Sequence, residues 1–346
     1  MTAGAQEVLA YSLVKGVGPR TVVQAVRDGS IAAEVRVPRV QAMMAQAAHI
    51  LRQTREQGAQ VRWVGGGGYP TALNQLHAPP PLLYLKGDAS LLDGTLVGVV
   101  GSREATPYGI RMTRWLGRGL AGHGVTVVSG LARGVDGAAH QACLDAGGAT
   151  VAVLATGVDQ VYPRRHEKLQ GRIAHQGLLV SEFPPGVTAE AHHFPRRNRI
   201  LAALCAGIVV VEAAERSGAL ITARIAMELG RDVMAVPGPA DARLSKGTNA
   251  LIRDGAQLVM EPDWVAEVVG ARAVGFTGST RENPTFRDPD LNVLWGALED
   301  GPAPVEGLVR RTALPPSRLL AALSTLEVEG WVERGRDSCI ARSVSG

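Results

Sequence analysis

The chain has 346 residues, of which 46% are hydrophobic and 20% are charged, and a formal net charge of +4. This composition excludes a disordered chain, and the length predicts two or three folding units of a globular α/β protein. There is no apolar run of about 18 residues and no signal-peptide pattern, so we expect no membrane span and a cytoplasmic location. The three cysteines are far apart and form no CxxC pair, so neither a metal nor a cofactor is expected.

The first 60 or so residues of the chain are predicted to be helical. Gly16, Val17 and Gly18 separate two apolar helical segments, and Pro19 suits the first turn of the second one. The pattern resembles a helix-hairpin-helix, whose turn amides can hold a DNA phosphate. A tight packing turn explains the same residues equally well. We therefore assign residues 1–78 to an N-terminal helical domain of helix-hairpin-helix or SAM-like type, and leave duplex binding open.

A long alternation of apolar runs and helical segments follows a glycine- and proline-rich zone. The runs are continuous rather than alternating, as in parallel strands that are covered on both faces. Such alternation predicts an extended Rossmann-like, doubly wound sheet over residues 79–268. Strands are expected at 82–85, 96–100, 125–128, 150–154, 178–180, 208–211, 233–236 and 257–259, and helices at 106–123, 136–146, 164–175, 217–229 and 248–253.

The C-terminal part of the chain is predicted to be a separate domain. Residues 269–288 lose apolar periodicity and gain Gly, Thr, Pro and charge, which is typical of a linker. Three helices and a terminal hairpin over 289–346 predict a winged-helix domain, a fold that often reads DNA with its third helix. That helix, at 317–329, carries Arg318 as its only base and two glutamates. Contact with another protein is therefore at least as good an interpretation as contact with duplex DNA.

The turns after the strands are the places to look for a site, because ligands of open α/β sheets bind beyond the carboxyl ends of the strands. Gly101 lets an anion approach the backbone, Ser102 offers a hydroxyl, and Arg103 offers a forked cation suited to phosphate. Thr106 is expected to cap the helix that follows. Taken alone, these residues fit an ordinary turn with an exposed arginine equally well.

A second glycine-rich turn follows the next strand. Ser129, Gly130 and Arg133 aim backbone amides and a cation at the same edge of the sheet. Asp136 is better explained as the N-cap residue of the next helix than as a general acid or base. His140, one turn further on, is expected to pack in the core.

A cluster of basic residues around one aromatic ring forms the third element. Phe194 can stack on an unpaired base, and the neighbouring arginines can neutralise phosphate. Residues 161–200 contain seven Arg or Lys against three acids, a local surplus that suits a polyanion. The expected contacts of this element are Phe194, Arg196, Arg197, Asn198 and Arg199.

Two later turns complete the predicted edge, with Ser217 and Gly218 in one and Lys246 in the other. The turns contain no GxxxxGK[ST], GxGxxG, GxSxG or HExxH pattern. A nucleoside triphosphatase, a dinucleotide enzyme, a serine hydrolase and a zinc protease are therefore not supported, and no catalytic residue is predicted.

Together these turns are similar to the DNA processing protein A (DprA/Smf) family. The likeness covers roughly residues 60–265 and rests on VGSREATPYG, VSGLARGVDGAAH, LATGVDQVYP, SEFPPG, FPRRNRI, SGALITA and AVPG in this order. It implies a Rossmann-like core that binds single-stranded DNA, protects incoming strands during natural transformation and loads the RecA recombinase. It also implies a homodimer through the sheet domain.

The resemblance further implies that Arg103, Phe194 and the cluster from Arg196 to Arg199 hold DNA, and that Ser129, Gly130, Ser217 and Gly218 line the pocket. One departure concerns Ala191, since some relatives carry a lysine three positions before the phenylalanine. The arginine at position 196, where some relatives have a small residue, offers a substitute cation.

An enzyme related to nucleotide phosphoribohydrolases is the alternative. Those proteins carry PGGxGTxxE, with the glutamate acting on the sugar. The corresponding turn here is RSGALITA, which has Ala223 in place of that glutamate. A DNA-binding protein that is not an enzyme is therefore the preferred interpretation.

Overall fold

The computed structural model describes residues 4–271, 286, 288–298, 301–328, 331–334 and 339–342. The chain divides into two compact units, Met1–Gly278 and Ser279–Gly346. Most of the predicted linker at 269–288 lies outside the described residues, as do Glu329 and Ser338, which belong to the predicted winged helix. Within the described ranges, no helix has both the length and the apolar character that a membrane crossing requires.

Four helices open the first unit, within the stretch that the sequence predicts to be helical. The turn between the first two contains Gly16 at φ +86°, a conformation that favours glycine, and Pro19 is the first residue of the second helix. Their apolar side chains share a core with Leu82 and Trp63, so the helices pack onto the first strands of the sheet. The helices are α1 (Ala5–Ser12), α2 (Pro19–Arg27), α3 (Ile31–Glu34) and α4 (Pro38–Glu56).

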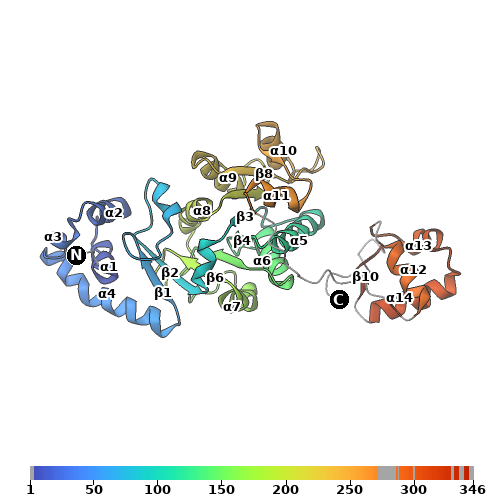
Figure 1. The fold of residues 1–346 in the computed structure, drawn as a ribbon, viewed down its shortest axis with the longest axis horizontal. Coiled ribbons are helices and arrows are strands. Elements are labelled where there is room, and N and C mark those ends of the chain that lie inside the picture. The colour runs from blue at the N-terminus through green and yellow to red at the C-terminus, as the bar shows by residue number, and fades with distance from the viewer. Residues whose placement is uncertain are drawn as a thin grey trace. The chain divides into compact units, whose positions relative to one another are not determined.

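A nine-stranded sheet forms the centre of this unit, with strand order β1-β2-β6-β5-β4-β3-β7-β8-β9 (Figure 1). The strands from β6 to β9 in this order run parallel, whereas β1 pairs antiparallel with β2 and β2 antiparallel with β6. The strands are β1 (Gln60–Trp63), β2 (Leu82–Gly87), β3 (Leu96–Val100), β4 (Thr126–Ser129), β5 (Thr150–Val153), β6 (Leu178–Ser181), β7 (Gly207–Val210), β8 (Asp232–Ala235) and β9 (Gln257–Leu258).

The extended Rossmann-like fold is thus confirmed, with two differences from the sequence analysis. The expectation that the strand at 82–85 is parallel is wrong, because a continuous apolar run reports burial on both faces and not strand direction. The strand β1 was not predicted, since it is only four residues long and lies between the end of a long helix and the glycine-rich zone.

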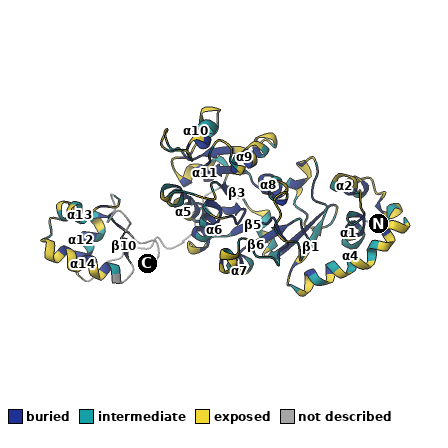
Figure 2. Cartoon of the chain, turned by 180° about the vertical axis from the view of Figure 1, so that it is seen from behind, coloured by how far each residue is buried: buried dark blue, intermediate teal, exposed yellow. Residues whose placement is uncertain are grey.

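Helices cover both faces of the sheet, and Figure 2 shows the inner strands β3, β5 and β6 between them as buried. Along β3, Leu96 and Val100 face the core under α8 (His193–Leu204) and α9 (Gly218–Glu228). The alternate residues Val97 and Val99 face the core under α5 (Pro107–Gly122), α6 (Val135–Asp145) and α11 (Pro262–Val268). The remaining elements are η1 (Thr71–Gln75), η2 (Ala89–Asp93), η3 (Arg164–His166), α7 (Glu167–Gln176) and α10 (Lys246–Arg253).

The strand order has a consequence for ligand binding. From β3 the chain adds β4, β5 and β6 on one side and then returns through α8 to add β7, β8 and β9 on the other. The strand order therefore reverses between β3 and β7. The connections that leave these two strands run to opposite sides, so their loops diverge and leave a crevice at the carboxyl ends of the strands.

The second unit is a winged helix, as predicted. Its helices pack around Leu294, Leu308 and Leu323, and its two strands form an antiparallel hairpin. Arg318, the base of the third helix, donates hydrogen bonds of 2.7 and 2.6 Å to both carboxylate oxygens of Asp290. The elements are α12 (Pro289–Ala297), α13 (Val305–Thr312), α14 (Pro316–Val328), β10 (Val332–Arg334) and β11 (Ile340–Arg342).

Candidate nucleic-acid interface

A cavity of about 410 Å³ lies at the point where the strand order reverses. Loops after β3, β4, β7 and β8 and one side of α8 line it, so the switch point predicted from strand order is where the structure is hollow. Seven of the predicted DNA-binding residues are among its lining residues: Gly101, Ser102, Arg103, Arg197, Asn198, Ser217 and Gly218. We call this cavity and its open rim the switch-point groove.

Arg103 is exposed at the groove and lies over an aromatic ring. Its guanidinium carbon is 4.8 Å from the ring centroid of Phe194, a cation–π distance. The ring of Tyr162 lies 5.6 Å from that of Phe194, and Tyr162 is 44% exposed. The structure therefore places two rings and one cation side by side. Sequence analysis missed Tyr162, although the LATGVDQVYP segment contains it.

Arg197 is a support for the groove rather than a free cation. Its side chain is buried and donates hydrogen bonds to the carbonyl oxygens of Gly130 and Val153, at the ends of β4 and β5. Its Nε donates to Asn198 Oδ1 at 3.0 Å. Burial lowers the pKa of the Arg197 guanidinium to about 10, so it remains charged at neutral pH.

The turn after β4 differs from the prediction in one respect. Asp136 is not the N-cap of α6, because that position belongs to Gly134 at φ +73°. The Asp136 carboxylate instead accepts hydrogen bonds from the backbone amides of Gly130 (3.2 Å) and Ala132 (3.3 Å), and so fixes the turn from inside. Burial raises the pKa of this carboxyl, with the positive charge of Arg197 opposing the rise.

Ser129 and Gly130 lie beneath the groove and not in it. The Ser129 hydroxyl is buried and donates to the Val99 carbonyl at 2.6 Å. A Cβ atom on Gly130 would lie 2.3 Å from a guanidinium nitrogen of Arg197, so glycine is needed for that arginine to reach the strand ends. Arg133 is exposed and does not line the cavity.

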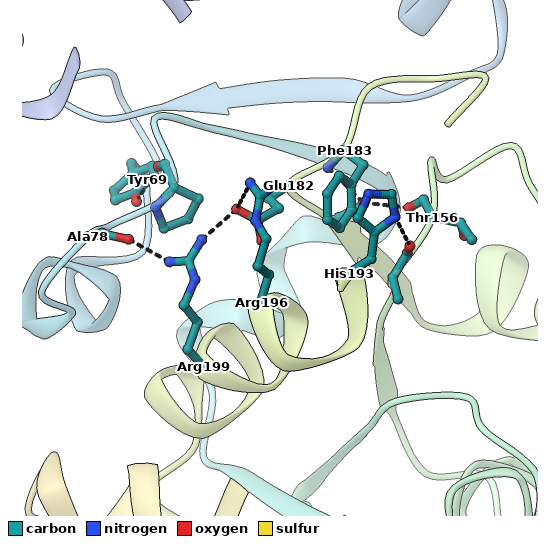
Figure 3. A network of polar contacts seen from close by, with 11 residues as sticks. Tyr69, Ala78, Thr156, Glu182, Phe183, His193, Arg196 and Arg199 are labelled. Carbon is teal, nitrogen blue, oxygen red and sulfur yellow. Dashed lines mark hydrogen bonds and ion pairs between the residues drawn. The ribbon is translucent and has the colours of Figure 1, made fainter. Parts of the chain in front are cut away.

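The other two arginines of the basic cluster share a buried carboxylate. Figure 3 shows Arg196 and Arg199 reaching Glu182, whose side chain is only 3% exposed. Arg199 also donates to the carbonyl oxygen of Ala78 at 2.6 Å, so it ties α8 to the loop before β2. Arg196 is 3.2 Å from Glu182 and 5.0 Å from the Phe183 ring centroid, with 45% of its side chain exposed. Arg196 can turn outward, whereas Arg199 is an internal contact.

Glu212 connects the two loops that face each other across the groove. It follows β7, and its carboxylate accepts hydrogen bonds from the Thr106 amide at 2.9 Å and from the Thr106 hydroxyl. Thr106 is the N-cap of α5, where its hydroxyl oxygen accepts from the Gly109 amide at 3.1 Å. Sequence analysis missed Glu212; the signal available was an acid directly after a fully apolar strand.

The far side of the groove carries further donors and cations. Ser217 caps α9 by accepting from the Ala219 amide at 3.2 Å, and Gly218 next to it is exposed. Arg243, which sequence analysis missed, is exposed and lines both the groove and a shallower hollow of about 300 Å³. Lys246 lies in that second hollow and not in the groove. The rim thus extends the positive charge of Arg103 across the carboxyl ends of β7 and β8.

Taken together, the fold and the site define an extended Rossmann-like protein with a cationic groove at its switch point and a winged-helix appendage. A family model described as DNA recombination-mediator protein A matches residues 60–270, and one described as DprA winged helix domain matches residues 279–337. The chain belongs to the DNA processing protein A (DprA/Smf) family.

Relatives and solved structures agree with this assignment. The chain is 40% identical over 273 residues to Protein Smf of Escherichia coli, covering 76% of this chain and 72% of that one. It is 46% identical over 191 residues to the DNA processing protein DprA of Streptococcus pneumoniae, covering 55% and 67%. The solved structure of DprA from S. pneumoniae matches with a TM-score of 0.68 at 35% identity, covering 77% and 98%.

A second solved structure also matches. It is DNA processing protein A from Helicobacter pylori, a protein with a unique single-stranded DNA binding mode. It matches with a TM-score of 0.55 at 31% identity, and covers 61% of this chain and 95% of that one.

Proposed function

We propose that this protein binds single-stranded DNA in the switch-point groove, in a DNA-processing role in natural transformation and recombination. One observation carries the proposal: Arg103 and Arg243, the Ser102 hydroxyl and the Ser217–Gly218 turn converge on one groove, with Phe194 and Tyr162 beside it. Exposed cations suit the phosphates, and the rings of exposed Tyr162 and half-buried Phe194 suit bases whose faces are free.

The rings favour an unpaired strand over a duplex. In a duplex the base faces are covered by stacking, so Phe194 and Tyr162 gain contacts only with bases that are unpaired. Stacking on an aromatic side chain contributes about 1–3 kcal/mol per base and depends little on sequence. The site therefore supports binding of single strands without strong sequence preference.

The proposal is tested by titrating an unstructured oligo-dT and a duplex of equal length over a salt series. We expect the single strand to bind more tightly at every salt concentration, and its affinity to fall as salt rises. Equal affinity for both, or no binding of oligo-dT at low ionic strength, would overturn the proposal. The variant Arg253→Ala is a matched control, because this exposed arginine pairs with Asp254 at the other end of α10 from Lys246.

We further propose that the bound strand is passed to the RecA recombinase. The description of the matching family, a DNA recombination mediator, supports this step. Mixing RecA, ATP and oligo-dT coated with single-strand-binding protein should give faster ATP hydrolysis when this protein is added. An unchanged rate would argue against recombinase loading while leaving strand binding intact.

A homodimer through the sheet domain is also proposed. The last strand, β9, lies at an edge of the sheet, and Leu258, Met260 and Trp264 there are 39%, 69% and 45% exposed. Exposed apolar side chains beside a sheet edge are typical of an interface. Light scattering should give twice the chain mass, and Trp264→Glu should reduce it to one chain; a monomeric wild type would refute the dimer.

We infer that the groove does not act as a nucleotide phosphoribohydrolase. Ala223, which stands where such enzymes carry the glutamate, is buried and does not line the groove. Incubation with AMP should release no adenine. Free adenine would reopen the enzymatic alternative.

A further inference from the structure

Three side chains that can bind a metal ion lie together where the chain enters α8. Glu190, His192 and His193 each offer one ligand atom, and these atoms are all within 4.8 Å of one another. Glu190 and His192 are exposed, whereas His193 is buried. None of the three is used by the strand-binding site described above.

The spacing of these atoms agrees with a tetrahedral ion. Zinc bonds to imidazole nitrogen and carboxylate oxygen are about 2.0–2.2 Å long, so two ligand atoms on a tetrahedral ion lie roughly 3.4 Å apart. His192 Nδ1 and Glu190 Oε2 are 3.4 Å apart. Only a small movement of the exposed side chains is needed to bring both onto one ion with His193.

His193 is held as a metal-binding histidine usually is. Its Nδ1 lies 3.2 Å from the carbonyl oxygen of Ala155, which can only accept a hydrogen bond, so Nδ1 carries the proton. The second ring nitrogen, Nε2, then has a free lone pair. Its ring lies against Phe183, with centroids 4.1 Å apart, which fixes its orientation (Figure 3). A histidine oriented by a backbone carbonyl is the common outer-shell arrangement of zinc sites.

We propose that Glu190, His192 and His193 bind one Zn²⁺ ion, with a fourth position open to a phosphate oxygen. Two imidazoles and one carboxylate are a donor set suited to Zn²⁺ or a similar transition-metal ion, and three protein ligands leave one position free. The divalent ion with one carboxylate keeps a net positive charge beside Phe194 and Arg196. The phosphate role rests on the proposed function, since it requires a strand in the adjacent groove.

The ligand set is tested without DNA. Titration of the full chain with ZnCl₂ in a calorimeter should show one site, and Co²⁺ should give the absorbance of a tetrahedral complex. His192→Ala and Glu190→Gln change exposed side chains and should each weaken Zn²⁺ binding at least tenfold. His175→Ala, on α7, is the matched control for an exposed histidine and should leave the binding unchanged. Failure of the wild type to bind Zn²⁺, or equal binding by His192→Ala, would overturn the site.

The open position is tested with oligo-dT at fixed ionic strength. Zn²⁺ at a concentration that fills the site should raise the affinity of the wild type severalfold and leave that of His192→Ala unchanged. Zn²⁺ that binds without changing the DNA affinity would overturn the phosphate role but not the ligand set. Because the zinc titration needs no nucleic acid, its outcome is independent of whether the groove binds single strands.

Discussion

Two groups of arginines in the sheet domain have different roles: one lines the switch-point groove, and the other holds α8 to neighbouring strands and loops. Arg103 and Arg243 are exposed and line the groove from the loops after β3 and β8. Arg197 and Arg199, on α8, direct their guanidinium groups to backbone carbonyls and to Glu182. A basic cluster in a sequence thus combines residues that contact a ligand with residues that hold the contact loops in place.

The difference has a physical origin in burial. A buried guanidinium is stable only where several acceptors replace its water, and the strand ends of β4 and β5 supply carbonyl oxygens for Arg197. An exposed guanidinium keeps its water and can exchange it for phosphate. Substitutions of buried and of exposed residues test this division.

Replacing Arg197 with alanine should destabilise the fold. The carbonyl oxygens of Gly130 and Val153 would lose their donor, at about 1–3 kcal/mol for each buried group left unpaired. We expect the free energy of unfolding to fall by about 2–5 kcal/mol in urea denaturation. Arg103→Ala, which removes an exposed side chain, should stay within about 0.5 kcal/mol of the wild type. Equal stability of both variants would contradict the division.

His140 should make the fold sensitive to acid. Burial lowers the pKa of this imidazole to about 3, with His166 and Arg197 contributing, while its Nδ1 lies 2.7 Å from the Thr150 hydroxyl. The unfolded chain takes up the proton near pH 6.5 and the folded chain does not, so stability falls as pH drops from about 6.5 towards 3. The loss is about 1.4 kcal/mol per pH unit in this range.

This pH dependence can be assigned to one residue. Urea denaturation of the wild type and of His140→Gln should be compared at pH 7 and pH 5. At pH 7 the variant should be less stable than the wild type. Its free energy of unfolding should, however, fall less than that of the wild type between pH 7 and pH 5. An identical slope in both proteins would show that His140 is not the group responsible.

Tyr162 should contribute to strand binding through its ring alone. Tyr162→Ala removes one of the two rings beside Arg103 and should cost about 1–3 kcal/mol of binding free energy for oligo-dT. The salt dependence should not change, because no charge is removed. Tyr162→Phe keeps the ring and should bind oligo-dT with the affinity of the wild type. A loss of the same size in both variants would rule out stacking.

The smallest effect is expected in the winged helix. Arg318 is 61% exposed, but two of its nitrogens donate to the oxygens of Asp290, so fewer of its donors are free for a ligand. Arg318→Ala should lower the melting temperature of this unit slightly and leave the affinity of the full chain for duplex DNA unchanged. A clear fall in duplex affinity would show that α14 reads DNA despite this ion pair.

The sequence predicted the sheet well and the individual contacts less well. Every expected strand is present, since continuous apolar runs are a local property of the chain. The helix α8 was not predicted, because its first turns contain Pro195 and several arginines and its continuous apolar run begins only at Ile200. The role of Arg197 depends on partners many residues away, and that of Asp136 depends on a loop that folds back onto it. No local sequence pattern reveals either contact.

Arg243 of the groove was missed for the same physical reason, since its contacts depend on distant parts of the chain. Arg243 belongs to the loop after β8, whose start is marked by the AVPG motif, but no pattern distinguishes Arg243 itself. Only the arrangement of β3, β7 and β8 brings it opposite Arg103. Strand order could be expected in general terms from the fold class, but the residues that meet across the groove required the structure.

The salt dependence of oligo-dT binding tests the central claim most directly. Each phosphate contact to a single strand contributes about 0.7 to the slope of log affinity against log salt. The double variant Arg103→Ala, Arg243→Ala should therefore lose about 1.4 from this slope, while Arg253→Ala keeps the wild-type value. A double variant whose slope equals that of the wild type would show that the strand does not lie in the switch-point groove.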